Sequence, residues 1–393
     1  MQEQELEKLG FSYTYSGPYK AGVEVATHYG FRLIPPVRGI HSLRSEIGPR
    51  HQFHKEHYID PAHKILIQNY VTSLNEPKNM QYMICHTRSP KKKGAGGIGL
   101  HIIGNNRSIA EALIIKTSLS ILAEYGYKNL VVEINSLGDK TSNKVFLKEL
   151  LNHYRRNISA IGDCCRTHMK NNPLMVVTCL NEACISVRND APRPINYLSE
   201  SGRDHLKNII EYLESMNTTY RINNDLIGEF PESGTQVSFI IKEDLGKDIC
   251  DEQILARGER YNRFTLNNQI KKTMPSVGAL IDIKKSGKEE YKNPQQKIPS
   301  IYLVHLGIEA KRKSLEIIEM FRQKNIPIAQ SLIYDDLAKQ IKRAESMSIN
   351  YTIIMGLKEA RERAVIVRNT STRAQEIVPF DSLLKYVKHI NRL

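Results

Sequence analysis

The 393-residue sequence contains no tryptophan, few cysteines and no long apolar run. Six cysteines in a chain of this length do not form the framework of a disulfide-rich secreted domain. No apolar stretch of about 18 residues is present, so we expect no membrane-spanning helix and no membrane partner. The amino-terminal segment MQEQELEKLG lacks the basic and apolar regions of a signal peptide. These absences predict a soluble, cytoplasmic protein.

The candidate metal ligands gather in one short segment of the chain. They are Cys164, Cys165, His168, Cys179 and Cys184. Their spacing, CCxxH followed by CxxxxC, matches no compact structural-zinc pattern. We therefore predict reduced, partly buried thiols and no metal site.

Acidic residues are fewer than basic ones. The chain has 56 Lys and Arg against 42 Asp and Glu, a net charge of +14 and a sequence pI near 9.3. This balance favours a polyanionic partner, most plausibly nucleic acid. The alternative is a basic soluble surface that binds no particular anion.

The length predicts two or three domains of ordinary size. The polar segment 286–299 has little periodicity and is the clearest linker. Strands and helices alternate after it, and residues 298–393 hold 16 Lys and Arg against 10 Asp and Glu, a net charge of +6. We expect a compact, basic α/β domain at 300–393.

The stretch from Ser108 to Asp139 carries the strongest local pattern. Ser108 and Glu111 have the spacing of a helix-starting capping box, and apolar residues then recur at helical intervals. Gly126 predicts the end of this helix, and Leu130 to Ile134 reads as a buried strand. Before it, two strands flank RSPKKKGAGGIG, which predicts a hairpin with a basic, glycine-rich tip.

Several sequence motifs, taken in order, resemble those of histidyl-tRNA synthetases, which are class II aminoacyl-tRNA synthetases. YGFRLIPPV resembles motif 1, MICHTRSP to GLHIIG resembles the motif 2 hairpin, and ARGERYNRF lies where the family has its GGRYD turn. Further similar stretches are VVEINSLGD, NNPLMVVTCLNEACISVRNDAPRPINYL and YTIIMGLKEARERAVIVRN.

The resemblance implies an α+β fold in two main parts. The first is a class II synthetase core at 1–285, an antiparallel sheet flanked by helices, with a helical insertion at about 155–222. The segment 286–299 is the linker, and 300–393 is an anticodon-binding-like α/β domain. The resemblance also implies a homodimer that forms through the class II core.

The chain departs from the family where the chemistry is most demanding. Adenylation requires cations that stabilise charge at the α-phosphate, and the planar arginine fork does this best. Arg88 matches one motif 2 arginine, but Lys93 stands near the other. The family's QFGVEAIG, whose Gln and Glu hold the amino acid, becomes GIGLHIIG, with Gly97 and His101. Gly228 and Glu229 replace the start of the histidine-specific RGLDYY motif, and Ile283 and Lys284 stand at the GLER end of motif 3.

We therefore interpret the chain as a family member without catalysis, needing no cofactor, that binds tRNA or other structured RNA or acts as a regulator. The predicted RNA contacts are Lys91, Lys92, Lys93, Lys342, Arg343, Arg361 and Arg363. One alternative is an active histidine–tRNA ligase that uses ATP and Mg²⁺, with nearby lysines as substitute cations. Another is a regulatory subunit of a biosynthetic enzyme such as ATP phosphoribosyltransferase, which would have a protein partner.

Overall fold

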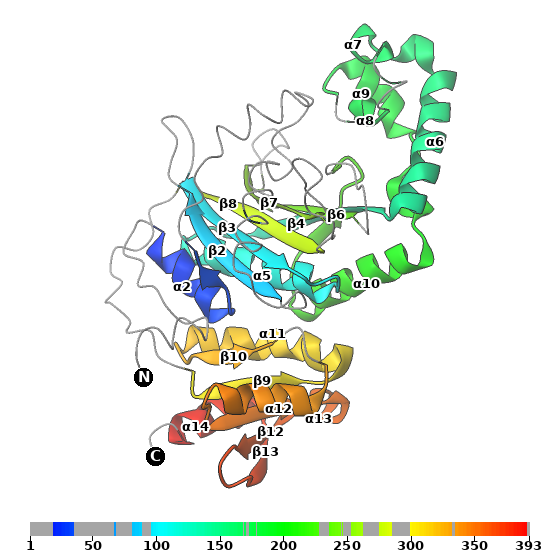
Figure 1. Ribbon diagram of the computed structural model, residues 1–393. Coiled ribbons are helices and arrows are strands. Elements are labelled where there is room, and N and C mark those ends of the chain that lie inside the picture. Colours follow the sequence, from blue (N-terminus) through cyan, green and yellow to red (C-terminus); the bar gives the residue numbers. More distant parts are fainter. Residues whose placement is uncertain are drawn as a thin grey trace.

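The computed structural model describes residues 19–34, 67, 81–88, 96–167, 169, 173–177, 179–227, 236–244, 246, 253–261, 275–284, 299–331 and 335–390. These residues form two units, each built on its own sheet (Figure 1). Almost all of the predicted linker at 286–299 lies outside the described ranges. Within those ranges, no helix has the length and apolar character needed to cross a bilayer.

The larger sheet joins strands that are far apart in the sequence. Its order is β1-β2-β3-β8-β7-β6-β4-β5. The strands are β1 (Arg32–Leu33), β2 (Tyr82–Arg88), β3 (Gly96–Ile103), β4 (Leu130–Gly138), β5 (Tyr220–Ile222), β6 (Gln236–Glu243), β7 (Ile254–Tyr261) and β8 (Ser276–Ile283). Neighbours from β2 to β4 pair antiparallel, and the short edge strands β1 and β5 run parallel to β2 and β4. The antiparallel core expected from the resemblance is confirmed.

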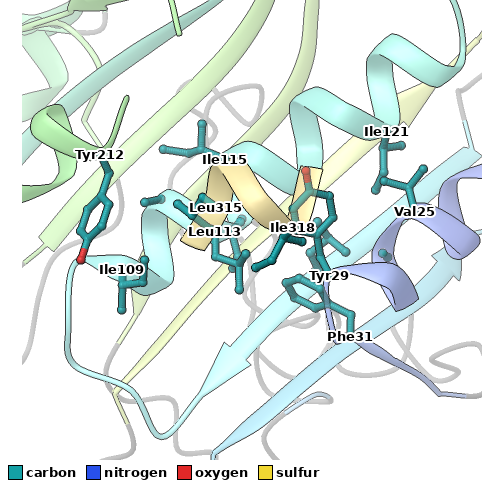
Figure 2. Packing of buried hydrophobic residues seen from close by; sticks show 14 of the residues in the cluster. Val25, Tyr29, Phe31, Ile109, Leu113, Ile115, Ile121, Tyr212, Leu315 and Ile318 are labelled. Atoms are coloured by element: carbon teal, nitrogen blue, oxygen red, sulfur yellow. The ribbon is translucent and has the colours of Figure 1, made fainter. Parts of the chain in front are cut away.

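Helices cover one face of this sheet. They are α2 (Lys20–His28), α5 (Ile109–Glu124) and α10 (Glu200–Ser215). The central helix α5 buries Ile, Leu and Ala residues around almost its whole circumference. A helix that is apolar all round must be covered on all sides. Here the sheet covers one side of α5, and α2, α10 and a helix of the second unit cover the others (Figure 2).

The start of α5 corrects the sequence prediction. The side chain of Ser108 makes no capping hydrogen bond, so the predicted capping box is wrong. Glu111 is fully buried and accepts hydrogen bonds from the Arg260 guanidinium and from His205. A buried carboxylate is stabilised more by a guanidinium than by a single backbone amide. Gly126, with φ of +78°, follows the helix as predicted.

The glycine-rich stretch before Leu100 corrects a second prediction. Its last residues are not a hairpin tip, because β3 begins at Gly96 and pairs with both β2 and β8. A Cβ atom on Gly96 would lie 1.8 Å from the hydroxyl oxygen of Tyr19. Glycine is present here because neighbouring atoms approach the strand backbone closely.

The insertion projects away from the sheet and has its own small core (Figure 1). Its helices are α6 (Lys140–Arg156), α7 (Asp163–Arg166), α8 (Leu174–Val177) and α9 (Glu182–Asn189), with short 3₁₀ turns at Ile158–Ala160 and Pro194–Tyr197. The Asp139 side chain caps α6 by accepting from the Ser142 amide at 2.8 Å. The following helix α10 packs on α5 and belongs to the main core.

The second unit is a five-stranded mixed sheet with order β10-β9-β11-β12-β13. Its strands are β9 (Ile301–His305), β10 (Ile328–Gln330), β11 (Tyr351–Met355), β12 (Ala364–Asn369) and β13 (Gln375–Pro379). Its helices are α11 (Gly307–Gln323), α12 (Leu337–Ser346), α13 (Leu357–Glu362) and α14 (Phe380–Ile390). Helices α11, α13 and α14 pack on one face, and α12 packs on the other. The predicted compact α/β unit is confirmed.

Helix α11 joins the two units into one continuous core. Leu315 and Ile318 of α11 lie in the same buried cluster as Ile115 of α5, as Figure 2 shows. The carboxylate of Glu319, also on α11, accepts a hydrogen bond from the Tyr29 hydroxyl of the first unit. The second unit is therefore docked on the helical side of the large sheet, which leaves the opposite side of that sheet free of it.

Candidate functional site

The face of the large sheet opposite α5 carries the polar side chains expected of a site. Side chains alternate between the faces of a strand, and Ile98, Leu100 and Ile102 of β3 point into the core with α5. Position 97 and position 101 therefore share the opposite face. Its polar members include His86, Arg88, His101, Gln236, Ser238, Arg257, Glu259, Tyr261 and Asp282.

Arg88 is held in an ion-pair cluster on this face. Its guanidinium lies 2.5 Å from Oδ1 of Asp282 and donates to the carbonyl oxygen of Ile281 at 3.1 Å. The other carboxylate oxygen of Asp282 accepts from Arg257 at 2.8 Å. All three charged side chains are no more than 20% exposed. One carboxylate thus serves two guanidinium groups, and the cluster keeps a net charge of about +1.

His101 lies in a buried hydrogen-bonded chain of three side chains. Its Nε2 is 3.3 Å from Nε2 of His86, and its Nδ1 is 2.7 Å from the Tyr261 hydroxyl. The two imidazole rings are nearly parallel, with centroids 5.4 Å apart. Burial, with a smaller contribution from Glu259, raises the pKa of the Tyr261 phenol far above its ordinary range. The phenol therefore stays protonated and can donate a hydrogen bond to His101. Both contacts of His101 can be made with the two imidazole rings neutral.

Glycines on β3 and β8 make room for these rings and for the strands themselves. A Cβ atom on Gly99 would lie 2.2 Å from His86 Nε2, and one on Gly278 would lie 2.5 Å from His101 Nδ1. At Gly97 the obstacle is backbone, because a Cβ atom there would lie 1.8 Å from the carbonyl oxygen of Ile281. Position 97 can carry no side chain unless β8 moves.

The two residues at the predicted end of motif 3 do not join this face. Ile283 is buried in the core on the α5 side of the sheet. Lys284 is exposed just after β8, and its backbone amide donates to the Tyr127 hydroxyl at 3.2 Å. Gly228, Glu229 and the hairpin lysines Lys91, Lys92 and Lys93 lie outside the described residues.

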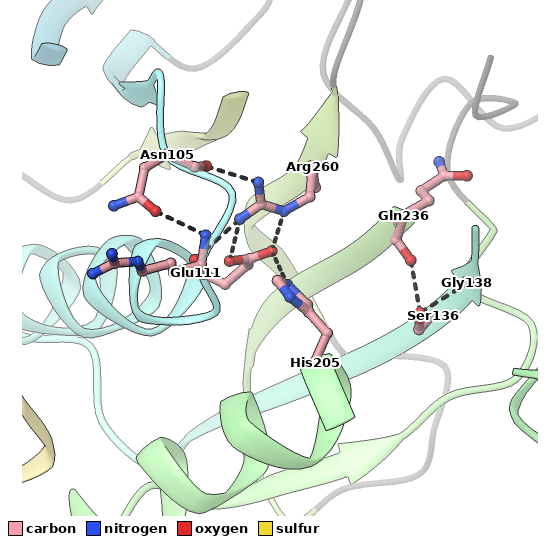
Figure 3. Close-up of polar contacts among 8 residues, drawn as sticks. Asn105, Glu111, Ser136, Gly138, His205, Gln236 and Arg260 are labelled. Atoms are coloured by element: carbon pink, nitrogen blue, oxygen red, sulfur yellow. Dashed lines mark hydrogen bonds and ion pairs between the residues drawn. The ribbon is translucent and has the colours of Figure 1, made fainter. Parts of the chain in front are cut away.

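A second polar cluster, which the sequence reasoning missed, lies on the α5 side of the sheet (Figure 3). Arg260 donates to both carboxylate oxygens of Glu111 at 2.5 and 2.6 Å, and His205 approaches the same carboxylate at 2.9 Å. Burial alone would raise the pKa of Glu111, but Arg260 and His205 outweigh it and lower the pKa to about 2. Arg260 also donates to the carbonyl oxygens of Asn105 and Arg107. This cluster ties β7 to the start of α5.

A bulge between β4 and β6 is fixed by local hydrogen bonds, which Figure 3 also shows. Ser136 Oγ donates to the carbonyl oxygen of Gln236 at 2.8 Å and accepts from the Gly138 amide at 3.1 Å. The β4–β6 register shifts between Ser136 and Gly138. The hydroxyl thereby satisfies backbone groups that the regular ladder would leave unpaired.

Comparisons with known proteins agree with this architecture. Residues 300–390 match the anticodon binding domain family. The histidine–tRNA ligase of Caldicellulosiruptor bescii is 23% identical over 335 residues, covering 83% of this chain and 78% of that protein. The chloroplastic histidine–tRNA ligase of Gracilaria tenuistipitata var. liui is 28% identical over 298 residues, covering 74% of this chain and 68% of that protein.

The chain is therefore similar to histidine–tRNA ligases over about three quarters or more of its length. The histidine–tRNA ligase of Halothermothrix orenii is a further relative, 26% identical over 299 residues that cover 75% of this chain and 70% of that protein. The crystal structure of the apo histidyl-tRNA synthetase of S. aureus aligns with 96% of this chain and 98% of its own, with 18% sequence identity and a TM-score of 0.49.

The predicted RNA contacts of the anticodon-binding domain lie on two elements. Lys342 and Arg343 are exposed on α12, and Arg361 and Arg363 are exposed in and just after α13. Because α12 and α13 pack on opposite faces of the small sheet, the four residues are not gathered into one patch. Within the described ranges, Lys342, Arg343 and Arg361 have no acidic partner.

Arg363 differs from the other three because it is already engaged. Its guanidinium pairs with Glu316 at 2.8 Å and lies over the Phe380 ring, 5.3 Å from the centroid. Its backbone has φ of +51°, and its carbonyl oxygen accepts from the Phe380 amide at 2.9 Å. These contacts join α13 to α11 and α14, so Arg363 has a structural role within the domain.

Proposed function

We propose that this chain is a member of the histidyl-tRNA synthetase family that binds tRNA or another structured RNA without activating histidine. The proposal that the protein does not activate histidine rests mainly on the position of His101. The resemblance implies a carboxylate at this position that holds the amino acid. In its place stands a buried imidazole whose two ring nitrogens contact His86 and Tyr261.

The charges of the same face support this proposal. Binding a histidine substrate would bring an ammonium group onto the face, and a buried cation needs a carboxylate partner. Asp282 is already shared by two arginines, and Glu133 accepts from Lys242 at 3.0 Å and from Asn223 at 2.6 Å. Recruiting Asp282 or Glu133 to a substrate would leave a protein cation without its partner. A third carboxylate of this face, Glu259, is buried near the Tyr261 phenol.

The cations that ATP would need are similarly engaged or displaced. Arg88 is the candidate arginine for the α-phosphate, and its guanidinium is paired with Asp282. At the position where motif 3 would supply an arginine, the chain has Ile283 in the core and Lys284 in solvent. Loss of one arginine at a phosphoryl-transfer site typically costs about 10³-fold or more in rate. Each of these positions favours a protein without adenylation activity.

The RNA half rests on charge and on the family of the carboxyl-terminal domain. Residues 300–390 match an anticodon binding domain, and residues 298–393 carry a net charge of +6. Exposed lysines and arginines without acidic partners are suited to phosphate contacts. The proposed contacts remain Lys342, Arg343 and Arg361, together with Lys91, Lys92 and Lys93 of the hairpin. Arg363 offers less, because Glu316 already neutralises it. We also propose that the protein is a homodimer formed through the class II core.

Histidine-dependent ATP–pyrophosphate exchange tests the non-catalytic half. We expect the full-length protein to show no exchange above a no-enzyme blank, beside an active histidyl-tRNA synthetase as the positive control. Clear histidine-dependent exchange would show that the protein is instead a divergent active ligase.

Filter binding of labelled tRNA tests the RNA half. We expect binding at low salt that weakens steeply as salt rises, because phosphate contacts release counterions. No binding at low salt would reject the RNA proposal. If the protein copurifies with a short catalytic chain and binds no RNA, the regulatory-subunit alternative replaces it.

A further inference from the structure

Four cysteine sulfurs converge in the insertion. Helices α7 and α9 lie at the end of the insertion that is farthest from the sheet (Figure 1). Cys164 and Cys165 lie on α7, Cys179 precedes α9, and Cys184 lies on α9. The four Sγ atoms all lie within 4.8 Å of one another. Cys179 Sγ is 3.6 Å from Cys164 Sγ, and the two α7 sulfurs are 3.8 Å apart. Three segments of chain thus bring their thiols to one point.

These distances fit ligands of a shared metal ion and do not fit disulfides. A disulfide requires its two sulfurs about 2.05 Å apart, and all four cysteines are free. A tetrahedral site with Zn–S bonds of about 2.3 Å places its sulfurs about 3.8 Å apart. The separations at Cys164 lie close to that value.

Backbone amides lie beside two of the four sulfurs. The backbone amide of Asn181 donates to Cys179, and that of Gly162 donates to Cys184. The Arg188 guanidinium donates to the carbonyl oxygen of Val177 at 2.6 Å, beside the segment that carries Cys179. Amide donors and a nearby cation offset the negative charge of a metal–thiolate centre.

We propose that Cys164, Cys165, Cys179 and Cys184 bind one Zn²⁺ ion as a tetrahedral four-thiolate site. Each thiol loses its proton on binding, so the four ligands and the metal form a centre with a net charge of −2. Four protein ligands leave no position open for substrate or water, which makes the site structural. A four-sulfur tetrahedral set selects zinc, or iron as the nearest competitor, over harder cations.

The size of the insertion explains why it would need a metal. Helices α7 and α8 have four residues each, and α9 has eight. Isolated helices shorter than about 12 residues are marginal in water, and a core this small stabilises them weakly. A bound ion cross-links α7, α9 and the segment between them. The sequence spacing missed the site because the two adjacent cysteines follow no CxxC pattern.

Metal analysis of the full-length protein, purified without a polyhistidine tag, tests the proposal. We expect one zinc per chain by mass spectrometry of the metal, and after cobalt replacement the visible absorption of a tetrahedral thiolate site. Iron at one per chain would overturn the zinc assignment. A metal-free protein, purified from zinc-supplemented cells and with all four thiols titratable under native conditions, would overturn the site itself.

Matched variants locate the ion. Cys164 is exposed, so Cys164→Ser removes a ligand without disturbing a packed core, and we expect it to lose most of the zinc. Cys85→Ser is the control, because Cys85 is buried in the main core, and it should keep one zinc per chain. His168→Ala should also keep zinc, and its loss there would overturn the four-cysteine set. Chelation should make the insertion sensitive to protease while the sheet stays resistant, whereas equal sensitivity of both would contradict a role confined to the insertion.

Discussion

The guanidinium of Arg88 reaches Asp282 by passing over Gly97. In the sheet register Arg88 lies opposite Gly97, and Gly97 lies opposite Asp282, so the three residues form one row across β2, β3 and β8. A Cβ atom on Gly97 would lie 3.2 Å from the Arg88 guanidinium nitrogen. The missing side chain therefore permits the ion pair. The departure from the family motif at Gly97 and the pairing of Arg88 with Asp282 therefore depend on one another physically.

Gly97→Ala should be strongly destabilising. Its Cβ atom would meet the Ile281 carbonyl at 1.8 Å and crowd Arg88, so β8 must shift and the ion pair must break. We expect the free energy of unfolding to fall by about 3 kcal/mol or more in urea titrations. Gly126→Ala is the control: its φ is +78° and nothing lies within 4 Å, so only backbone strain of about 1 kcal/mol is added. Equal costs for the two variants would show that β8 does not close over position 97.

Asp282→Asn should leave two arginines without their anion. The side chains are mostly buried, so we expect a loss of about 2 kcal/mol in the free energy of unfolding. Asp244→Asn is the matched control, because Asp244 pairs with Arg221 at 3.2 Å at a surface where the side chains are 40% and 54% exposed. That pair should contribute less than about 0.5 kcal/mol. If Asp282→Asn costs no more than Asp244→Asn, the cluster does not hold Arg88.

The sequence predicts the elements well wherever periodicity is local. The strands and helices predicted to alternate after the linker do so from β9 to β12. The resemblance also predicts the antiparallel core and the anticodon-binding domain. Such features follow from residues that are close in sequence or from motifs read as units.

Contacts between residues that are far apart in the sequence could not be predicted from it. Gly96 and Gly97 read as a turn because glycine is a local turn signal, and only the approach of Tyr19 and Ile281 makes them strand residues. Glu111 has the spacing of a capping box, yet its partner Arg260 lies 149 residues away. In the insertion the cysteine spacing gave no metal signature, because the sulfurs converge through tertiary packing.

Acid should destabilise the protein in two steps. Burial lowers the pKa of His28 and of His305 to about 4. The nearby cation Arg322 adds to this effect at His28, and Lys311 adds to it at His305. In the unfolded chain these histidines have a pKa near 6.5, so between about pH 6.5 and pH 4 they bind protons that the folded protein does not bind. The free energy of unfolding is therefore highest above about pH 6.5 and falls until about pH 4. Glu111, whose folded pKa is about 2, adds stability that is lost as the pH drops from about 4.5 toward 2.

Calorimetric melting temperatures measured from pH 8 to pH 3 would resolve the first step. Each histidine contributes at most about 3 kcal/mol to it. His305→Leu should therefore reduce the fall between pH 6.5 and pH 4 by about half and leave the step below it in place. An unchanged profile in this variant would mean that His305 takes up its proton in the folded state as readily as in the unfolded state.

Measurements of tRNA binding should distinguish the exposed cations Lys342, Arg343 and Arg361 from Arg363, which is already paired with Glu316. If Lys342, Arg343 and Arg361 contact phosphates, each alanine variant should weaken tRNA binding several-fold and lower the slope of log affinity against log salt by about 1. Lys144→Ala is the control, because Lys144 is exposed on α6. This helix belongs to the insertion, on the other side of the large sheet's unit from the carboxyl-terminal domain (Figure 1). Arg363→Ala should lower the melting temperature, through loss of the Glu316 pair and the Phe380 contact, with a smaller change in slope.

The slope distinguishes a lost contact from a damaged domain. A variant that only destabilises the domain lowers the fraction of competent protein and leaves the salt dependence of the remaining binding unchanged. A variant that removes a phosphate contact changes the slope even when its melting temperature is normal. If Lys342, Arg343 and Arg361 all leave the slope as it is in Lys144→Ala, tRNA does not bind at α12 and α13. The hairpin lysines at 91–93 would then be the remaining proposed contacts.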